Sequence, residues 1–166
     1  SSADLDNPIL NSPYEAPDRH FVMGNHGPTG EIAPGRRRSE SFIPIPPSKK
    51  GKGAGEQVEI DFDITGERLA ENELINEIRY RVELWRNRRY PDVTPISRKL
   101  LEHWAGIADV REDRMLFCQR EAAETAIYLA EVAGRKGEPD YRVRVDEQNR
   151  IHNDGLPRIA LKMATG

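Results

Sequence analysis

Two short stretches of this sequence carry side chains that could bind a nucleotide. The first holds Gln119, within the helical segment 117–132, and on a wheel of about 100° per residue it shares a face with five alanines and Ile127. A glutamine amide has both a donor and an acceptor, the pair needed to read the edge of an adenine. We therefore expect Gln119 on the buried face of a helix. Without a ligand, the same glutamine could bond to a nearby backbone group or face solvent at the helix start.

The second stretch is the end of the sequence, where the apolar run 159–161 leads into Ala164, Thr165 and Gly166. Small residues after a buried strand let backbone N–H groups close around phosphate oxygens. We predict a strand over 158–163 that is buried on both faces. A frayed chain end would explain the same residues equally well, because the Gly-Lys-Ser/Thr that completes such a loop is not in the sequence.

A cluster of positive charge between residues 79 and 100 is a third candidate. This segment contains seven arginines and lysines but only two acidic residues. Arg79, Arg86, Arg88 and Arg89 could contact DNA phosphates. A solvated helix face, with its cations toward the C-terminus of the helix, explains most of the same pattern.

Other kinds of chemistry find little support in the sequence. The four histidines are scattered, and none has metal-ligand spacing beside Cys118, so we predict no metal site. No nucleophile and base pair is recognisable, so we predict no catalytic residue in this chain. A single cysteine excludes an internal disulfide and favours the cytoplasm. The net charge of -3 gives no overall signal for nucleic acid, so any basic surface must be local.

The elements that must position these residues divide the chain near residue 55. Residues 1–55 hold eight of the twelve prolines and seven glycines, so we predict an extended or disordered arm and linker with little regular structure. Residues 56–166 form the second part, mostly helical. We predict helices over about 69–89, 95–104 and 112–133, and strands over 58–64, 141–145 and 158–163. Thr94 is the expected N-cap of the second helix, and Gly106 and Gly134 the expected ends of the second and third.

Several of these segments resemble a known family. The stretch "RMLFCQREAAETAIYLAEV" followed by "GLPRIALKMATG" is similar to the start of the helicase domain of superfamily 2 ATPases. The arm segments "NPILNSPYEAPDRHF" and "GRRRSESFIPIP" resemble the N-terminal region of type III restriction enzyme Res subunits. The resemblance implies an α/β fold. It implies an incomplete first RecA-like P-loop NTPase domain, mostly helical in this chain, that ends inside the Walker A phosphate loop.

The resemblance also implies roles for individual residues. Gln119 would read adenine, Phe117 would pack beside the base, and Ala164, Thr165 and Gly166 would open the phosphate loop. ATP and Mg²⁺ would be the cofactors of the complete protein. DNA and a methyltransferase (modification) subunit would be its partners, with a nuclease domain outside this chain.

The chain departs from the family pattern in one decisive respect. The Lys of the loop, its magnesium-binding Ser or Thr and the acidic pair of the hydrolysis motif are missing from the sequence. Since transition-state stabilisation needs these groups, we expect no ATP hydrolysis by this chain alone. The alternative hypothesis is a non-enzymatic helical module that binds DNA or protein through the basic segment 79–100.

Overall fold

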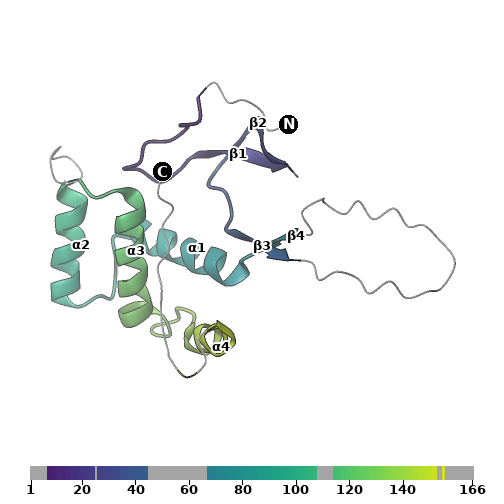
Figure 1. Ribbon diagram of the computed structural model, residues 1–166. Coiled ribbons are helices and arrows are strands. Elements are labelled where there is room, and N and C mark those ends of the chain that lie inside the picture. Colours follow the sequence, from purple (N-terminus) through teal and green to yellow (C-terminus); the bar gives the residue numbers. More distant parts are fainter. Residues whose placement is uncertain (1–6, 25, 45–66, 108–113, 153–154, 156–166) are drawn as a thin grey trace.

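The computed structural model describes residues 7–24, 26–44, 67–107, 114–152 and 155. This part of the chain combines two small two-stranded sheets with four α-helices, one of which continues into a π-helical turn (Figure 1). Such a mixture of helix and strand is compatible with an α/β class. The strands predicted over 58–64 and 158–163 lie outside the described residues, as do Ala164, Thr165 and Gly166. In the described ranges, no helix is long and apolar enough to cross a bilayer.

The N-terminal arm is more regular than its prolines and glycines predict. Strands β1 (Arg19–Gly24) and β2 (Gly27–Pro34) form an antiparallel hairpin, so the prediction of little regular structure is wrong for this segment. Gly27 has a φ of 108°, which places it in the region that only glycine adopts readily, and so it closes the tight turn. One of the glycines that suggested a loop therefore forms part of the hairpin turn.

A second strand pair joins the arm to the helices. Strand β3 (Glu40–Pro44) pairs antiparallel with β4 (Glu67–Glu71), and helix α1 (Glu73–Asn87) follows directly. Residues 67–71 are therefore a strand, and the first helix begins later than predicted. Asn76 of α1 fixes the junction, because its Oδ1 accepts from the Ser39 N–H at 2.7 Å and its Nδ2 donates to the Ser39 carbonyl at 3.0 Å.

The second helix, α2 (Pro95–Ile107), begins as the sequence predicts. The Ser97 N–H donates to Thr94 Oγ1 at 3.3 Å, which confirms Thr94 as the N-cap. The helix runs through Gly106 to Ile107, so Gly106 is not its end.

Helix α3 (Phe117–Ile127) passes into a π-helical turn, Tyr128–Val132, and Gly134 follows with a φ of 76°. The next element is helix α4 (Arg142–His152), so the strand predicted over 141–145 is wrong. Part of the reason is local. Asp140 Oδ1 accepts from the Arg142 N–H at 3.0 Å at the helix start, where a carboxylate is favourable.

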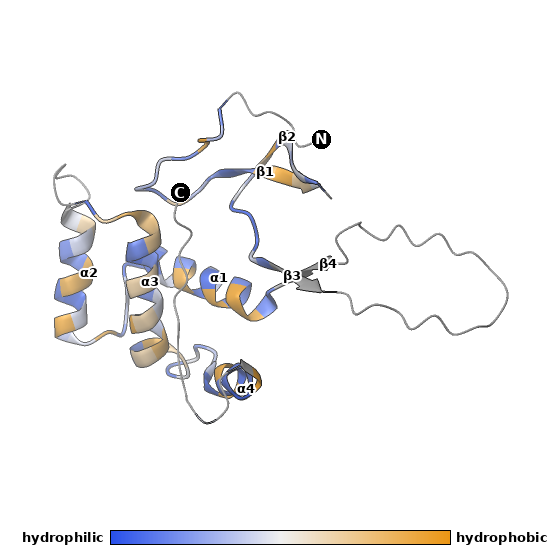
Figure 2. Ribbon diagram, viewed as in Figure 1, coloured by the Kyte–Doolittle hydropathy of each residue, from blue (hydrophilic) through white to orange (hydrophobic). Residues whose placement is uncertain are grey.

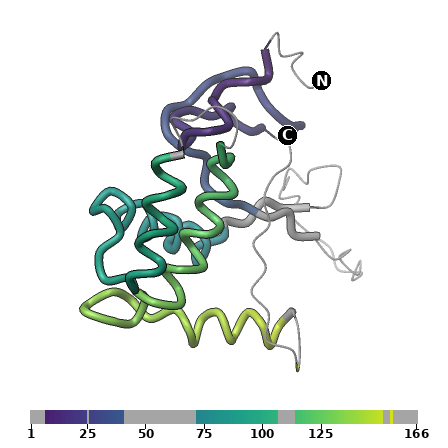
Figure 3. Tube along the Cα trace, turned by 90° about the vertical axis from the view of Figure 1, so that its left-hand side faces the viewer, coloured from purple at the N-terminus to yellow at the C-terminus, as the bar shows by residue number. Residues whose placement is uncertain are grey.

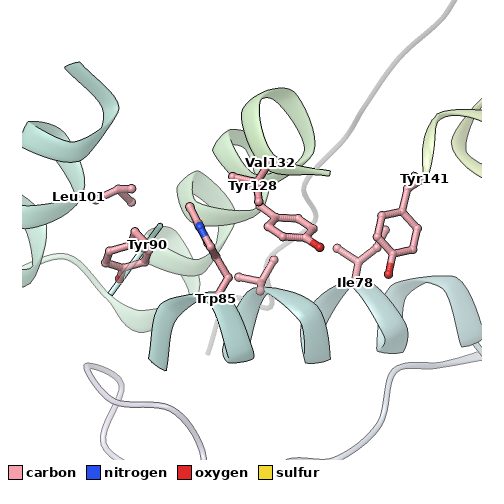
Figure 4. Close-up of a cluster of buried hydrophobic side chains, with 8 residues drawn as sticks. Ile78, Trp85, Tyr90, Leu101, Tyr128, Val132 and Tyr141 are labelled. Atoms are coloured by element: carbon pink, nitrogen blue, oxygen red, sulfur yellow. The ribbon is translucent and has the colours of Figure 1, made fainter. Parts of the chain in front are cut away.

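The core is formed by side chains of α1, α2 and the π-helical turn together with Tyr90 and Tyr141, and α3 packs against both α1 and α2. Figures 1 and 3 show α2 and α3 side by side, with the hairpin at one end of them and α4 at the other. Trp85 lies between Tyr90 and Tyr128, with ring centroids 4.9 and 5.6 Å away (Figure 4). Its indole N–H donates to the Pro91 carbonyl at 2.9 Å, so the buried polar atom is satisfied.

Candidate functional site

The buried face of α3 is built on two glutamates rather than on its alanines. Glu121 and Glu124 are 8% and 0% exposed, whereas Gln119 and Ala126 are exposed. The prediction that Gln119 lies on a buried face is therefore wrong. In Figure 2, hydrophilic and hydrophobic residues are interleaved along α3.

Glu124 can be buried because three partners surround its carboxylate. Arg86 Nε lies 2.5 Å from one oxygen, and the other accepts from the Tyr90 hydroxyl at 2.9 Å and lies 3.2 Å from Arg120 Nε. Burial raises the pKa of Tyr90 to about 12, and the Glu124 charge adds to the shift. Burial alone would lower the pKa of Arg86, but the two glutamates outweigh it and the net shift is upward.

Glu121 extends this network to the arm. Arg36 Nη1 and Arg86 Nη2 lie 2.7 and 3.1 Å from the same carboxylate oxygen, Oε2. Arg36 and Glu121 are far apart in the sequence, so this ion pair fastens the end of the hairpin to α3. Charge-assisted bonds of this kind stabilise only when both partners are present, because an unpaired buried charge is costly.

Phe117 lies under this network. Its side chain is 5% exposed, and the guanidinium carbons of Arg36, Arg86 and Arg120 lie 5.1 to 5.7 Å from its ring centroid. Cations over an aromatic face at this distance are attracted to the ring. The Phe117 N–H also donates to the Pro13 carbonyl at 2.8 Å, which is a second contact with the arm.

Gln119 lies in the first turn of α3 and faces away from Phe117, since two residues span about 200° of a helix. Its Oε1 accepts from the Leu116 N–H at 3.1 Å, one half of a capping box. Its Nε2 makes no hydrogen bond within the described part of the chain. The backbone contact is the ligand-free explanation given above, and the adenine-reading role stays a prediction. Phe117, buried on the other side, stays a predicted neighbour of the base as well.

Beside the network lies a cleft of about 410 Å³ between the arm, α1 and α3. Its walls carry five arginines and two glutamates: Arg36, Arg37, Arg38, Arg79, Arg86, Glu83 and Glu121.

Arg79 differs from three other arginines of the cleft, which have ion-pair partners. Arg36 and Arg86 pair with Glu121, and Arg37 Nη2 pairs with Glu40 at 2.8 Å. Arg79 makes no ion pair with any residue in the described ranges. Burial lowers its pKa, and the nearby Arg36 charge lowers it further.

The four arginines predicted to bind DNA do not form one face. Arg79 lines the cleft, and Arg86 belongs to the buried network. Arg88 Nη2 pairs with Glu138 at 2.7 Å, and Arg89 is exposed beyond the end of α1 with a φ of 59°. Arg86 and Arg88 are therefore engaged in internal ion pairs, whereas Arg79 lines the cleft without an ion pair to any described residue.

The residues that sequence reasoning missed are Arg36, Glu121 and Glu124. A signal for them exists in the sequence, because Phe117, Glu121, Glu124 and Tyr128 recur at spacings of four, three and four residues. Glutamates in this pattern argue against a buried helix face unless arginine partners for them are known. One partner, Arg36, lies in the arm, where no periodicity points to it.

The comparisons with known proteins give no family assignment. A scan against protein-family models found no match, and searches of curated proteins and of solved structures found no significant match. Among the described residues, no group of three or more histidines, cysteines, aspartates or glutamates is placed to hold a metal ion.

Proposed function

We propose that this chain is the N-terminal portion of an ATP-dependent DNA translocase of the type III restriction class. In this proposal it supplies the adenine side of the ATP site and begins a RecA-like P-loop domain. The resemblance of the segments around Gln119 and at the C-terminus supports the proposal. The observation that carries it is the exposed, oriented amide of Gln119 at the start of α3.

The geometry of this amide suits an adenine. An amide oxygen has two lone pairs, and the Leu116 N–H uses one of them. One lone pair and the two N–H donors of Nε2 remain for a ligand. Adenine presents an acceptor at N7 and a donor at N6, so one amide can bind both. Because the backbone bond already fixes the side chain, little rotamer entropy would be lost on binding.

The phosphate-binding part of the proposed ATP site would come from residues other than Gln119. In this proposal Ala164, Thr165 and Gly166 would contribute to the phosphate loop, and the Lys and Ser or Thr that bind phosphate and Mg²⁺ would come from outside this sequence. DNA and a methyltransferase subunit are the proposed partners of the complete protein. ATP turnover must therefore be measured on a protein that continues through the whole loop, since this chain alone lacks those groups.

The test is Gln119→Ala in that longer protein, with Gln148→Ala as the matched control. Gln148 is also exposed on a helix, α4, so both variants remove the same side chain from a similar environment. We expect the KM for ATP to rise about tenfold in Gln119→Ala, which corresponds to about 1.4 kcal/mol for the lost amide contacts. The preference for ATP over GTP should fall, and DNA binding should stay unchanged.

Two outcomes would count against the proposal. Unchanged ATP kinetics and unchanged ATP preference in Gln119→Ala would remove the adenine-reading assignment. A longer protein that binds DNA but has no ATPase activity would favour the alternative, a non-enzymatic module that uses the basic segment 79–100.

A further inference from the structure

The arginine-lined cleft is a separate feature from the proposed ATP site. Its walls come from the arm after β2, from the face of α1 opposite the core and from the inner face of α3. Gln119 is not part of its lining. An inference about the cleft therefore holds whether or not Gln119 reads adenine.

The charges of the cleft favour an anionic ligand. Arg79 is partly buried there near the like charge of Arg36, and it forms no ion pair with the described residues. The charge of Glu121 offsets part of this effect on Arg79, but Glu121 already pairs with Arg36 and Arg86. Arg79 thus has the like charge of Arg36 nearby and no carboxylate partner of its own among the described residues, and like charges repel each other. An anion placed between them removes that repulsion and completes the hydrogen bonds of Arg79.

The size and the rim of the cleft narrow the choice of anion. A volume of about 410 Å³ exceeds what a lone inorganic phosphate would fill and falls in the range of small-ligand pockets. Tyr80, the residue after Arg79 on α1, lines the same cleft and is 57% exposed. An exposed aromatic ring beside cations is the combination that holds nucleotides, with the base stacked on the ring and the phosphate on the arginines.

We propose that this cleft binds a nucleotide unit, with its phosphate at Arg79 and its base stacked on Tyr80. Arginine suits the first role because its planar fork can donate two hydrogen bonds to one phosphate. The unit is either a free nucleotide or one nucleotide of a single strand, and the two sources share the same chemistry. Arg86 takes no part, because Glu121 and Glu124 already bind its guanidinium group.

The experiment measures binding of a fluorescein-labelled single-stranded oligothymidylate of about 15 nucleotides by fluorescence anisotropy. Arg79→Gln should weaken binding about tenfold and should reduce the salt slope of log K by about 0.7, the value for one phosphate contact on a single strand. Tyr80→Ala should weaken binding about tenfold while leaving the salt slope unchanged. Arg150→Gln is the matched control, because Arg150 is an exposed arginine on α4, away from the cleft, and should bind like the parent protein.

Competition by unlabelled ligands distinguishes a free nucleotide from one nucleotide of a strand. If thymidine 5′-monophosphate displaces the labelled strand, a free nucleotide unit is enough. If only an unlabelled strand displaces it, the ligand is a strand. Equal competition by thymidine and thymidine 5′-monophosphate would overturn the assignment, because it would mean that no phosphate is bound.

Equal affinities and salt slopes for Arg79→Gln and the parent protein would overturn the proposal too. The circular dichroism spectrum and urea midpoint of each variant are measured beside its affinity, and Arg79→Lys restores the charge where Arg79→Gln is less stable. Failure here leaves the ATP kinetics of Gln119→Ala untouched, so the two proposals can fail separately.

Discussion

Replacement of Glu124 by glutamine tests whether the buried ion pairs of α3 hold the helices together. Glu124 is fully buried and contacts Arg86 at 2.5 Å, Arg120 at 3.2 Å and the Tyr90 hydroxyl at 2.9 Å. Glutamine has nearly the same shape and still offers an oxygen to Tyr90. The substitution therefore removes one negative charge and leaves the packing of the helix in place.

The expected loss follows from the partners that remain. Removing one partner of a buried ion pair costs about 3 to 5 kcal/mol, because the other charge stays buried. Arg86 keeps Glu121 at 3.1 Å, and the side chain of Arg120 is 21% exposed, so neither arginine is left wholly without stabilisation. We therefore expect a loss of stability at the lower end of this range, about 3 kcal/mol, which is a change of more than 100-fold in the folding equilibrium.

Urea unfolding measures this loss directly. With a slope of about 2 kcal/mol per molar urea, a loss of about 3 kcal/mol lowers the midpoint by about 1.5 M. Tryptophan fluorescence is a suitable signal because Trp85 packs against Tyr90, a direct partner of Glu124. Glu147→Gln is the control, since Glu147 is exposed on α4 and makes the same change of charge far from the network.

The reasoning fails if Glu124→Gln and Glu147→Gln unfold at the same urea concentration. A double-mutant cycle sharpens the result. When Arg86→Met is combined with Glu124→Gln, the pair should lose less than the two single losses together, because in the double variant neither member of this pair is left buried without the other. Strictly additive losses would show that Arg86 and Glu124 do not interact.

The remaining predictions concern the ends of helices and turns. Thr94→Ala removes the N-cap hydroxyl of α2 and should cost about 1 kcal/mol in urea unfolding. Hydrogen bonds from the Ser97 hydroxyl and then from Thr94 lower the pKa of Glu131 below 4.5. The contribution of Glu131 to stability is therefore full above pH 4.5 and is lost as the pH falls through the lowered pKa. A urea midpoint that stays constant when the pH is lowered below 4.5 would contradict this. Gly134→Ala should lower the melting temperature more than Gly137→Ala, because both have positive φ but an added Cβ at Gly134 would lie 3.0 Å from a side-chain atom.

The local signals in the sequence predicted some of the fold well. The apolar spacing of Ile78, Val82 and Trp85 predicted α1, and the three residues form part of the core. The Thr94-Pro95 pair predicted the start of α2 to the residue. Such signals succeed because the physical cause, a buried stripe or a capped helix end, lies within a few residues of the chain.

The failures have a common cause in contacts over long distances in the sequence. The alternation of Tyr141, Val143 and Val145 is a valid strand pattern, yet α4 forms because Tyr141 is anchored in the core and its hydroxyl donates to Glu77 at 3.0 Å. Arg144, in the first turn of α4, reaches the same carboxylate. Tertiary contacts of this kind decide between helix and strand where the local preference is weak.

The candidate site shows the same limit of prediction from local sequence even more clearly. Hydropathy predicts that glutamates lie outside, whereas Arg36, Arg86 and the other partners of Glu121 and Glu124 allow both to be buried. Because Arg36 belongs to the arm, the inner face of α3 is complete only when the arm is docked. The docked arm in turn supplies one wall of the arginine-lined cleft. The arm is thus a structural part of both the network and the proposed nucleotide site, although its composition alone predicts a flexible tail.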